Sequence, residues 1–264
     1  MDVLKKCLNV VRSRLSGADK RGIRDDLRLF FLHLPKCGGS SVRNALASAV
    51  DPEKIAALHP HASRRAAAIC GEDMLCYRAS LLPYYMAMGD VSVLTGHFPW
   101  SDEAYEQFGE EWIYATVLRH PVRRWFSHYF YDRYKEHSDH FKIAEDLSTF
   151  LQSKRAHEMG ALYARRLSDP EVVRVDQAAE QAKENLERFD VVGVLDDLHV
   201  LNRKLEECLG VELEIEKKNE SPARERKQNA MQDEAIREQV EDLCAADLEI
   251  YNHIRERNAG EARS

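Results

Sequence analysis

The chain has 264 residues, of which 44% are hydrophobic and 31% charged, and its formal net charge is −7 at pH 7. This length suits one large α/β domain or two small ones, and we expect a single domain over 1–264. The acidic balance offers no electrostatic footprint for a nucleic-acid partner. The sequence contains no run of 18 apolar residues, so no transmembrane segment is predicted, and the charged start lacks the apolar core of a secretory signal. The six cysteines are scattered and none form CxxC, so we expect reduced thiols in a cytoplasmic protein.

The predicted elements alternate between strands and helices along the chain. A charged N-terminal helix and linker occupy 1–26, a motif-bearing core occupies 27–225, and a C-terminal helix occupies 230–257. Apolar runs predict strands within 27–34, 91–100, 112–121 and 189–198, with an alternating edge strand at 211–215. Helical patterns fill 40–50, 51–70 with a break near Pro60, 122–136, 143–167, 173–189, and a segment after 198 that Gly210 closes. This order predicts an α/β fold, a P-loop-like three-layer sandwich with a central parallel sheet flanked by helices.

The stretch FLHLPKCGGSSVRNAL, at 31–46, carries the first candidate site. An apolar strand ends at a proline, and a glycine-containing turn leads into a helix. The first N–H groups of such a helix have no internal partners and carry partial positive charge, so they attract anions. Lys36 adds a full charge, Gly38 and Gly39 allow close backbone approach, and Ser40 and Ser41 add hydroxyl donors. The alternative is an ordinary strand–turn–helix junction with a capping serine.

The second candidate site is VLRHPVRRWFSHY, at 117–129. Arg119 stands at the carboxyl end of a predicted strand, where ligands of α/β proteins usually lie, and Ser127 lies on the helix that follows. A nucleoside-triphosphate P-loop has its lysine after its glycines, whereas Lys36 precedes them. A magnesium–nucleotide site also favours an acidic residue at a neighbouring strand end, whereas this strand leads to a cation. Arg119 could instead be a structural ion-pair partner, with Ser127 facing solvent.

Taken together, HLPKCGGSS and LRHPVRRWFSHY resemble the two cofactor-binding signatures of the sulfotransferases that use 3′-phosphoadenosine 5′-phosphosulfate (PAPS). The closer resemblance is to the branch that contains carbohydrate 2-O-sulfotransferases and bacterial relatives, and it covers about 27–225. Cys37 stands where threonine is common in the family. A helix N-terminus can activate a thiol, but no helper base adjoins Cys37, and we expect a small loop side chain rather than a nucleophile.

The resemblance assigns each matched residue to one end of the co-substrate. The loop that holds the 5′-phosphosulfate corresponds to Lys36, Cys37, Gly38, Gly39, Ser40 and Ser41. The pair that grips the 3′-phosphate corresponds to Arg119 and Ser127. Family members also carry a late Asn-Ser-type segment that closes over the nucleotide, and Asn219, Ser221 and Arg224 are candidates for this role. A solvated charged loop is the alternative for that segment.

Sulfuryl transfer needs a base for the acceptor proton and positive charge near the leaving phosphate. We predict that His97, on a Gly-His turn after a strand, is the base and has a pKa suited to neutral pH. The resemblance also places a Gly-His at this strand in the hexuronic-acid branch. A turn histidine bonded to backbone is the alternative. Lys36 would neutralise the leaving phosphate, and the scheme needs no metal.

The acceptor is expected to be a hydroxyl-bearing saccharide or other small molecule. Its contacts should come from the segments predicted to be least regular, 55–90 and 132–170. Cationic and imidazole side chains on or beyond the helix after Arg119 are further candidates: Arg123, Arg124, Arg133, His128, His137 and His140. The charge of the segments 55–90 and 132–170 is mixed, so it does not decide the acceptor class, and the oligomeric state stays open. Two other functions compete with sulfuryl transfer, a non-catalytic nucleotide-binding module and a P-loop kinase.

Overall fold

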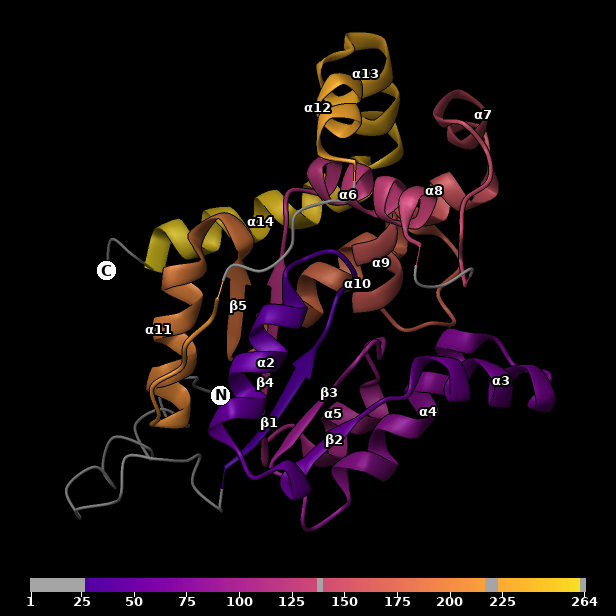
Figure 1. Cartoon of the computed structure of the whole chain (residues 1–264). Coiled ribbons are helices and arrows are strands. Elements are labelled where there is room, and N and C mark those ends of the chain that lie inside the picture. Colours follow the sequence, from indigo (N-terminus) through magenta and orange to yellow (C-terminus); the bar gives the residue numbers. More distant parts are fainter. Residues whose placement is uncertain (1–26, 137–139, 217–222, 262–264) are drawn as a thin grey trace.

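A computed structural model of the chain describes residues 27–136, 140–216 and 223–261. Its five strands form one all-parallel sheet in the order β2-β3-β1-β4-β5. The strands are β1 (Arg28–Leu32), β2 (Ile55–Ala57), β3 (Val93–Gly96), β4 (Trp112–Leu118) and β5 (Val191–Val194). Helices lie on both faces of this sheet, which confirms the predicted α/β three-layer arrangement (Figure 1). The predicted N-terminal helix at 1–26 lies outside the described residues.

Helices connect the strands and extend beyond the last one. They are α2 (Gly39–Ala49), α3 (Pro60–Cys70), α4 (Met74–Met86), α5 (Asp102–Phe108), α6 (Pro121–Tyr134), α7 (Leu147–Leu151), α8 (Lys154–Gly160), α9 (Leu162–Leu167), α10 (Val175–Glu187), α11 (Leu198–Leu209), α12 (Arg224–Gln232), α13 (Glu234–Leu243) and α14 (Ala245–Glu261), with short 3-10 turns at Pro52–Lys54 and Leu195–Asp197. Helices α12 and α13 stand out from the body of the molecule beside α6 (Figure 1). In the part of the chain that the structure describes, no helix is long and apolar enough to cross a membrane.

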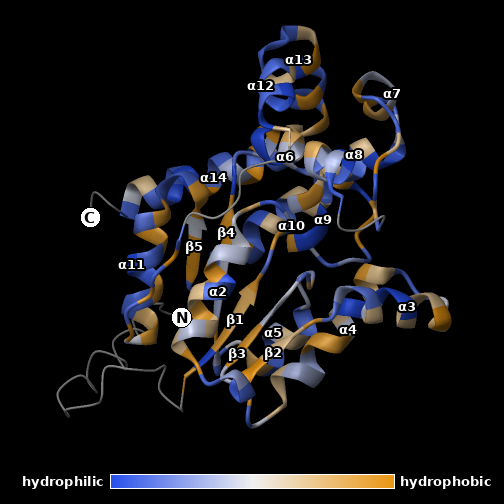
Figure 2. Ribbon diagram, viewed as in Figure 1, coloured by the Kyte–Doolittle hydropathy of each residue, from blue (hydrophilic) through white to orange (hydrophobic). Residues whose placement is uncertain are grey.

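The strands are almost wholly apolar because both faces of the sheet are covered. The residues of β4 are all buried, and Figure 2 shows the central strands as hydrophobic while the outer helices carry polar faces. The main core packs the sheet against α2, α10 and α14. A second hydrophobic cluster joins α6 and α8 to α13, around Trp125, Phe150 and Val240. This second cluster fixes α6, the helix that carries Ser127.

Strand register brings the motif residues to one edge of the sheet. Leu32 of β1 pairs with Gly96 of β3 and with Thr116 of β4, so the three strands end at nearly the same level. His33 and His97 are therefore the next residues on neighbouring strands, and His33 N–H donates to the carbonyl of Gly96 at 3.0 Å. Since β1 and β4 are also neighbours, the loop after Leu32 meets the residue after Leu118, which is Arg119.

Four predicted elements differ in the structure. The predicted helix over 51–70 contains strand β2, because Ile55 pairs with Val93 and this tertiary pairing overrides alanine's helix preference. The helix predicted over 143–167 is three short helices, α7, α8 and α9. The segments 55–90 and 132–170 are thus mostly helical, and the expectation that they are irregular is wrong.

The single helix predicted over 230–257 is also wrong, because α13 ends at Leu243 and α14 begins at Ala245. Its apolar stripe serves two separate clusters, so the chain changes direction between them: Val240 packs in the second cluster and Ile254 in the main core.

The edge strand predicted at 211–215 is absent, although Val211 and Leu213 are buried as the alternation requires. Side chains of α11 satisfy the backbone there in place of a neighbouring strand. Glu206 accepts from Leu213 N–H at 2.8 Å, and Asn202 donates to the Leu213 carbonyl at 3.1 Å.

Candidate active site

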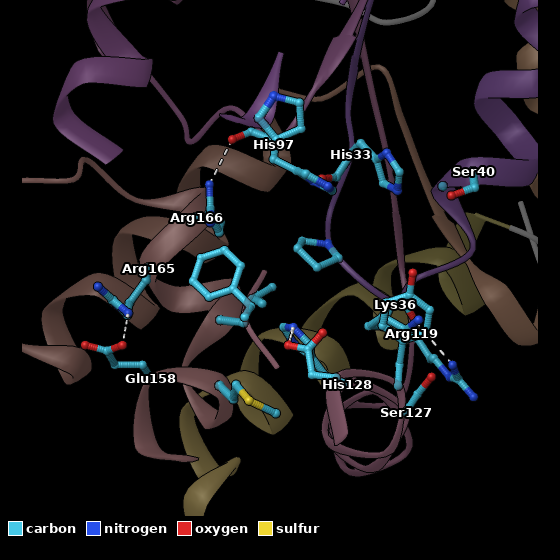
Figure 3. A pocket seen from close by; sticks show the side chains of 18 of the residues that line it. His33, Lys36, Ser40, His97, Arg119, Ser127, His128, Glu158, Arg165 and Arg166 are labelled. Carbon is cyan, nitrogen blue, oxygen red and sulfur yellow. Dashed lines mark hydrogen bonds and ion pairs between the residues drawn. The ribbon is translucent and has the colours of Figure 1, made fainter. Parts of the chain in front are cut away.

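A cavity of about 880 Å³ opens at the carboxyl edge of the sheet, beyond β1, β3 and β4. This is the edge at which parallel α/β sheets bind their ligands. Most of the residues predicted to form a site line it: Lys36, Gly38, Gly39, Ser40, Ser41, His97, Arg119 and Ser127. In Figure 3, His97 lies on one side of the cavity, and Lys36, Arg119 and Ser127 lie on the other. The structure therefore brings together two segments that are about 80 residues apart in sequence.

The loop between β1 and α2 has a backbone conformation and close packing that require glycine at two positions. Lys36 and Gly38 both have left-handed φ values, 64° and 82°. A Cβ on Gly39 would lie 2.2 Å from Cδ2 of His33, and one on Gly38 would lie 2.5 Å from Cδ1 of Leu195. Gly38 caps α2 without a side-chain acceptor, and in the first turn Ser41 N–H donates to the Gly38 carbonyl at 3.0 Å. The N–H groups that precede Ser41 have no acceptor within a helix and can bind an anion. Such a loop can hold an oxyanion against bare backbone.

Hydrogen bonds to its backbone hold Arg119 in place, and its side chain lines the cavity. The Tyr163 hydroxyl accepts from Arg119 N–H at 2.9 Å and donates to the Arg119 carbonyl at 2.6 Å. Arg119 Nη1 donates to the carbonyl of Lys36 at 3.2 Å, which joins the two predicted motifs directly. Ser127 is buried on α6 and lines the same cavity. Tyr163 was not predicted, because nothing local in the sequence marks a tyrosine 44 residues downstream as a partner of Arg119.

Cys37 lies behind the loop rather than in the cavity. Its side chain is fully buried, and its Sγ lies 3.2 Å from the Tyr163 hydroxyl. Because the single proton of that hydroxyl goes to the Arg119 carbonyl, the Cys37 thiol is the donor. Burial raises the pKa of Cys37, which keeps the group a thiol. Cys37 is thus a packed side chain of the loop, and it does not line the cavity, although the resemblance assigns it to the loop that holds the phosphosulfate.

Lys36 points its ammonium at an aromatic face. Nζ lies 3.4 Å from the ring centroid of Tyr131 on α6, the distance of a cation–π contact. Desolvation by burial lowers the pKa of Lys36 from 10.5 to about 8, although nearby Asp132 acts in the opposite direction. Lys36 is therefore mostly charged at neutral pH and loses its proton at mildly alkaline pH.

His97 is fixed as a neutral imidazole with a defined tautomer. Its Nδ1 lies 2.6 Å from the carbonyl of His33, so Nδ1 carries the proton and Nε2 keeps its lone pair. The two imidazole rings are 4.6 Å apart. Burial lowers the pKa of His97 to about 4, with Arg166 and Arg78 acting in the same direction and the hydrogen bond to the His33 carbonyl in the opposite one. The prediction of a near-neutral pKa for His97 is wrong, because the fold buries this turn among cationic side chains.

Asp132 lines the cavity and holds three neighbouring basic side chains, and it was not predicted as a site residue. Its carboxylate is nearly buried and bonds Lys135 at 2.8 Å and Arg155 at 2.5 Å, and His128 Nε2 lies 3.5 Å away. His128 and Arg155 thereby line the cavity in fixed positions. The only hint in the sequence is the helical spacing that places Asp132 one turn beyond His128.

Of the other predicted candidates, some line the cavity, some lie away from it, and some lie outside the described residues. His140 lines the cavity, as does His61 on the facing helix α3. Away from the cavity lining, Arg123 pairs with Asp196 at 3.5 Å on the surface, Arg124 is fully buried beside Asp247, and Arg133 donates to the carbonyl of Ile143. Arg224 is exposed at the first residue of α12 and does not line the cavity. Asn219, Ser221 and His137 lie outside the described residues.

The charge of the cavity lining is strongly positive. Six cationic side chains line it, namely Lys36, Arg78, Arg119, Arg155, Arg165 and Arg166, against three carboxylates, Asp73, Asp132 and Glu158. Two of the cations have carboxylate partners, since Arg155 binds Asp132 and Arg165 lies 3.7 Å from Glu158. The other four have no ion pair with any described carboxylate. Such a cavity suits a ligand with several negative charges.

Comparison with protein-family models finds no match for this chain, and a search of curated proteins finds no significant relative.

Proposed function

We propose that the protein is a sulfotransferase that moves the sulfuryl group of PAPS to a hydroxyl of a small molecule or saccharide. The observation that carries this proposal is the junction of Lys36 and Arg119 at neighbouring strand ends, inside one cavity that also holds His97. Neither cation has a described carboxylate partner, so both are available to a multiply charged ligand. The resemblance of the two sequence motifs supports the same ligand.

The residues present fit the two phosphate-bearing ends of a bis-phosphorylated adenosine. Lys36, Ser40 and the N-terminal N–H groups of α2 would hold the 5′-phosphosulfate, where a Cβ on Gly38 or Gly39 would meet neighbouring side chains. Arg119 and Ser127 would hold the 3′-phosphate, and an arginine is suited to bidentate phosphate binding.

The co-substrate supplies an activated sulfuryl group: the bond from acceptor oxygen to sulfur forms while the bond from sulfur to the 5′-phosphate oxygen breaks, and that electron pair stays on the phosphate. Lys36 balances the charge that collects on this oxygen. The acceptor proton goes to Nε2 of His97, whose Nδ1–H stays on the His33 carbonyl and fixes the ring. The products are a sulfate ester, adenosine 3′,5′-bisphosphate (PAP) and a proton that His97 returns to solvent.

Radiolabelled PAPS, an acceptor library and mass spectrometry test the proposal in the presence of a chelator. We expect an acceptor to gain one SO₃ unit, and Lys36→Met to lower kcat/KM by roughly 100-fold or more, as for loss of a charge-stabilising donor. Lys183→Met removes a lysine that pairs with Glu180 on α10 and should leave the rate unchanged.

His97→Gln should lower kcat by roughly 100-fold while PAP binding is retained, because the base acts on the acceptor proton alone. Full activity of this variant would remove His97 from the role of base. Binding of PAP without transfer to any acceptor would instead favour a nucleotide-binding module, and magnesium-dependent turnover of ATP would favour a kinase.

A further inference from the structure

Two arginines on the His97 side of the cavity carry charges that the donor site does not use. Arg78 comes from α4 and Arg166 from α9, and both guanidiniums donate to the carbonyl oxygen of His97, at 3.2 Å and 2.9 Å. Both line the cavity. Figure 3 shows Arg166 beside His97, across the cavity from Lys36 and Arg119. The two arginines thus form a second cationic centre at a distance from the first.

Arg78 is buried, and no carboxylate of the described residues forms an ion pair with it. It is only 4% exposed, and its other bonds go to Ser63 Oγ and the Pro60 carbonyl, both at 3.1 Å. All of these acceptors are neutral. A buried guanidinium without an anionic partner is costly to maintain, since hydrogen bonds to neutral groups recover only part of its lost hydration. Burial lowers the pKa of Arg78 to about 10, and nearby Arg64 acts in the same direction. Burial lowers the pKa of Arg166 to about 9, with Arg78 and Arg165 acting in the same direction and Asp73 in the opposite one.

Two neighbouring arginines of the cavity lining, in contrast, are neutralised by carboxylates. Arg165 precedes Arg166 on α9 and lies 3.7 Å from Glu158, and Arg155 binds Asp132 at 2.5 Å. Tying the His97 turn to α4 and α9 explains the hydrogen bonds of Arg78 and Arg166, and a neutral amide side chain could make similar bonds. It does not explain two positive charges that converge on one carbonyl beside an open cavity.

We propose that Arg78 and Arg166 bind an anionic group of the acceptor, a carboxylate, sulfate or phosphate, so that the acceptor is an anionic hydroxyl compound. This proposal rests on the proposed sulfotransferase function. A guanidinium has five N–H donors, and the described bonds use three from Arg78 and one from Arg166, which leaves donors for a ligand. An anion held there brings the rest of the acceptor to the side of the cavity where His97 lies.

Arginine side-chain NMR spectra of the full chain test this site directly, with inorganic sulfate as the probe. PAP is first added to saturation, and the Nε–H signal of Arg119 should shift as the donor site fills. Sulfate is then titrated, and the signals of Arg78 and Arg166 should shift saturably while that of Arg165 stays in place. Arg166→Met should abolish the sulfate response of Arg78 and change the affinity for PAP less than twofold. Phosphate and acetate in place of sulfate identify which oxyanion the site prefers.

The possible failures of the two proposals are distinguishable. If PAP does not move the Arg119 signal, the proposed donor is wrong, and the sulfate titration still reports on Arg166 in the protein without PAP. If PAP binds but sulfate gives no saturable shift at Arg166, the donor site stands and the anion site is overturned.

A comparison of matched acceptors tests the consequence for specificity. Pairs of hydroxy compounds that differ only in carboxylate or carboxamide are supplied with PAPS. The acid should be preferred in kcat/KM by roughly 10- to 100-fold, the range expected for hydrogen bonds to a charged group. Arg166→Met should remove this preference, whereas Arg165→Met should retain it, because the Arg165 charge already has Glu158. Equal rates for acid and amide in the wild-type protein, or an unchanged preference in Arg166→Met, would overturn the proposal.

Discussion

Raising the pH above neutrality should weaken PAP binding as Lys36 loses its proton. The lysine is buried, and its pKa of about 8 is well below the usual value of 10.5. The charged form exists below this pKa, so the attraction for the 5′-phosphate is present at pH 7 and is lost as the pH rises through 8. The second ionisation of a phosphate monoester lies near pH 6, so the ligand keeps its charge over this range.

The pKa sets the size of the effect. With a pKa of about 8, Lys36 is about nine-tenths protonated at pH 7 and about one-tenth protonated at pH 9. If only the charged form binds, the affinity for PAP falls roughly tenfold between these two values. A lysine with an ordinary pKa would lose less than about 5% of its charge by pH 9.

Isothermal titration calorimetry of PAP from pH 7 to pH 9.5 measures this dependence. Lys36→Arg is the matched variant, because a guanidinium stays charged throughout, and its affinity should be independent of pH. A wild-type affinity that stays constant to pH 9.5 would refute the assignment of Lys36 to the phosphate. An equal decline in Lys36→Arg would assign the dependence to another group.

Two further predictions concern groups that support the site. Tyr131→Leu removes the ring that faces Lys36 and should shift the alkaline decline to lower pH by up to about one unit, whereas Tyr131→Phe keeps the ring and the profile; the same calorimetry checks both, and identical profiles would contradict the cation–π contact. Asp247→Asn leaves the fully buried Arg124 without its carboxylate and should lower the free energy of unfolding by about 3–5 kcal/mol. Asp196→Asn, at an exposed pair, should change it by less than about 1 kcal/mol, and urea unfolding should show the contrast.

Much of the fold could be predicted because its signals are local. A buried parallel strand needs a continuous apolar run, and four of the five strands have one, including 27–34 and 112–121. Strand β2 has no such run: it is three residues long, and its pairing with β3 defines it. The bend between α13 and α14 was equally hidden, because a single stripe of apolar residues does not reveal that its two halves pack in different clusters.

The residues of the candidate site also differ in whether the sequence could predict them. The loop at Lys36 and the strand end at Arg119 were predictable, since each lies within a contiguous motif that leaves a strand. Residues such as Arg78 and Arg166 were not, because only the three-dimensional fold brings α4 and α9 to the turn at His97. The same burial explains the error in the pKa of His97, as desolvation cannot be read from a Gly-His turn.

The central claim is that the Lys36 loop binds the 5′-phosphate of PAP while Arg119 and Ser127 bind its 3′-phosphate, and the affinities for PAP and for adenosine 5′-phosphate test it most directly. The two ligands differ only in the 3′-phosphate, which Arg119 is proposed to hold. Calorimetry should show that the wild-type protein prefers PAP by roughly 10- to 100-fold, and that Arg119→Met binds both ligands about equally. Equal affinities in the wild-type protein, or a preference that survives in Arg119→Met, would contradict the account.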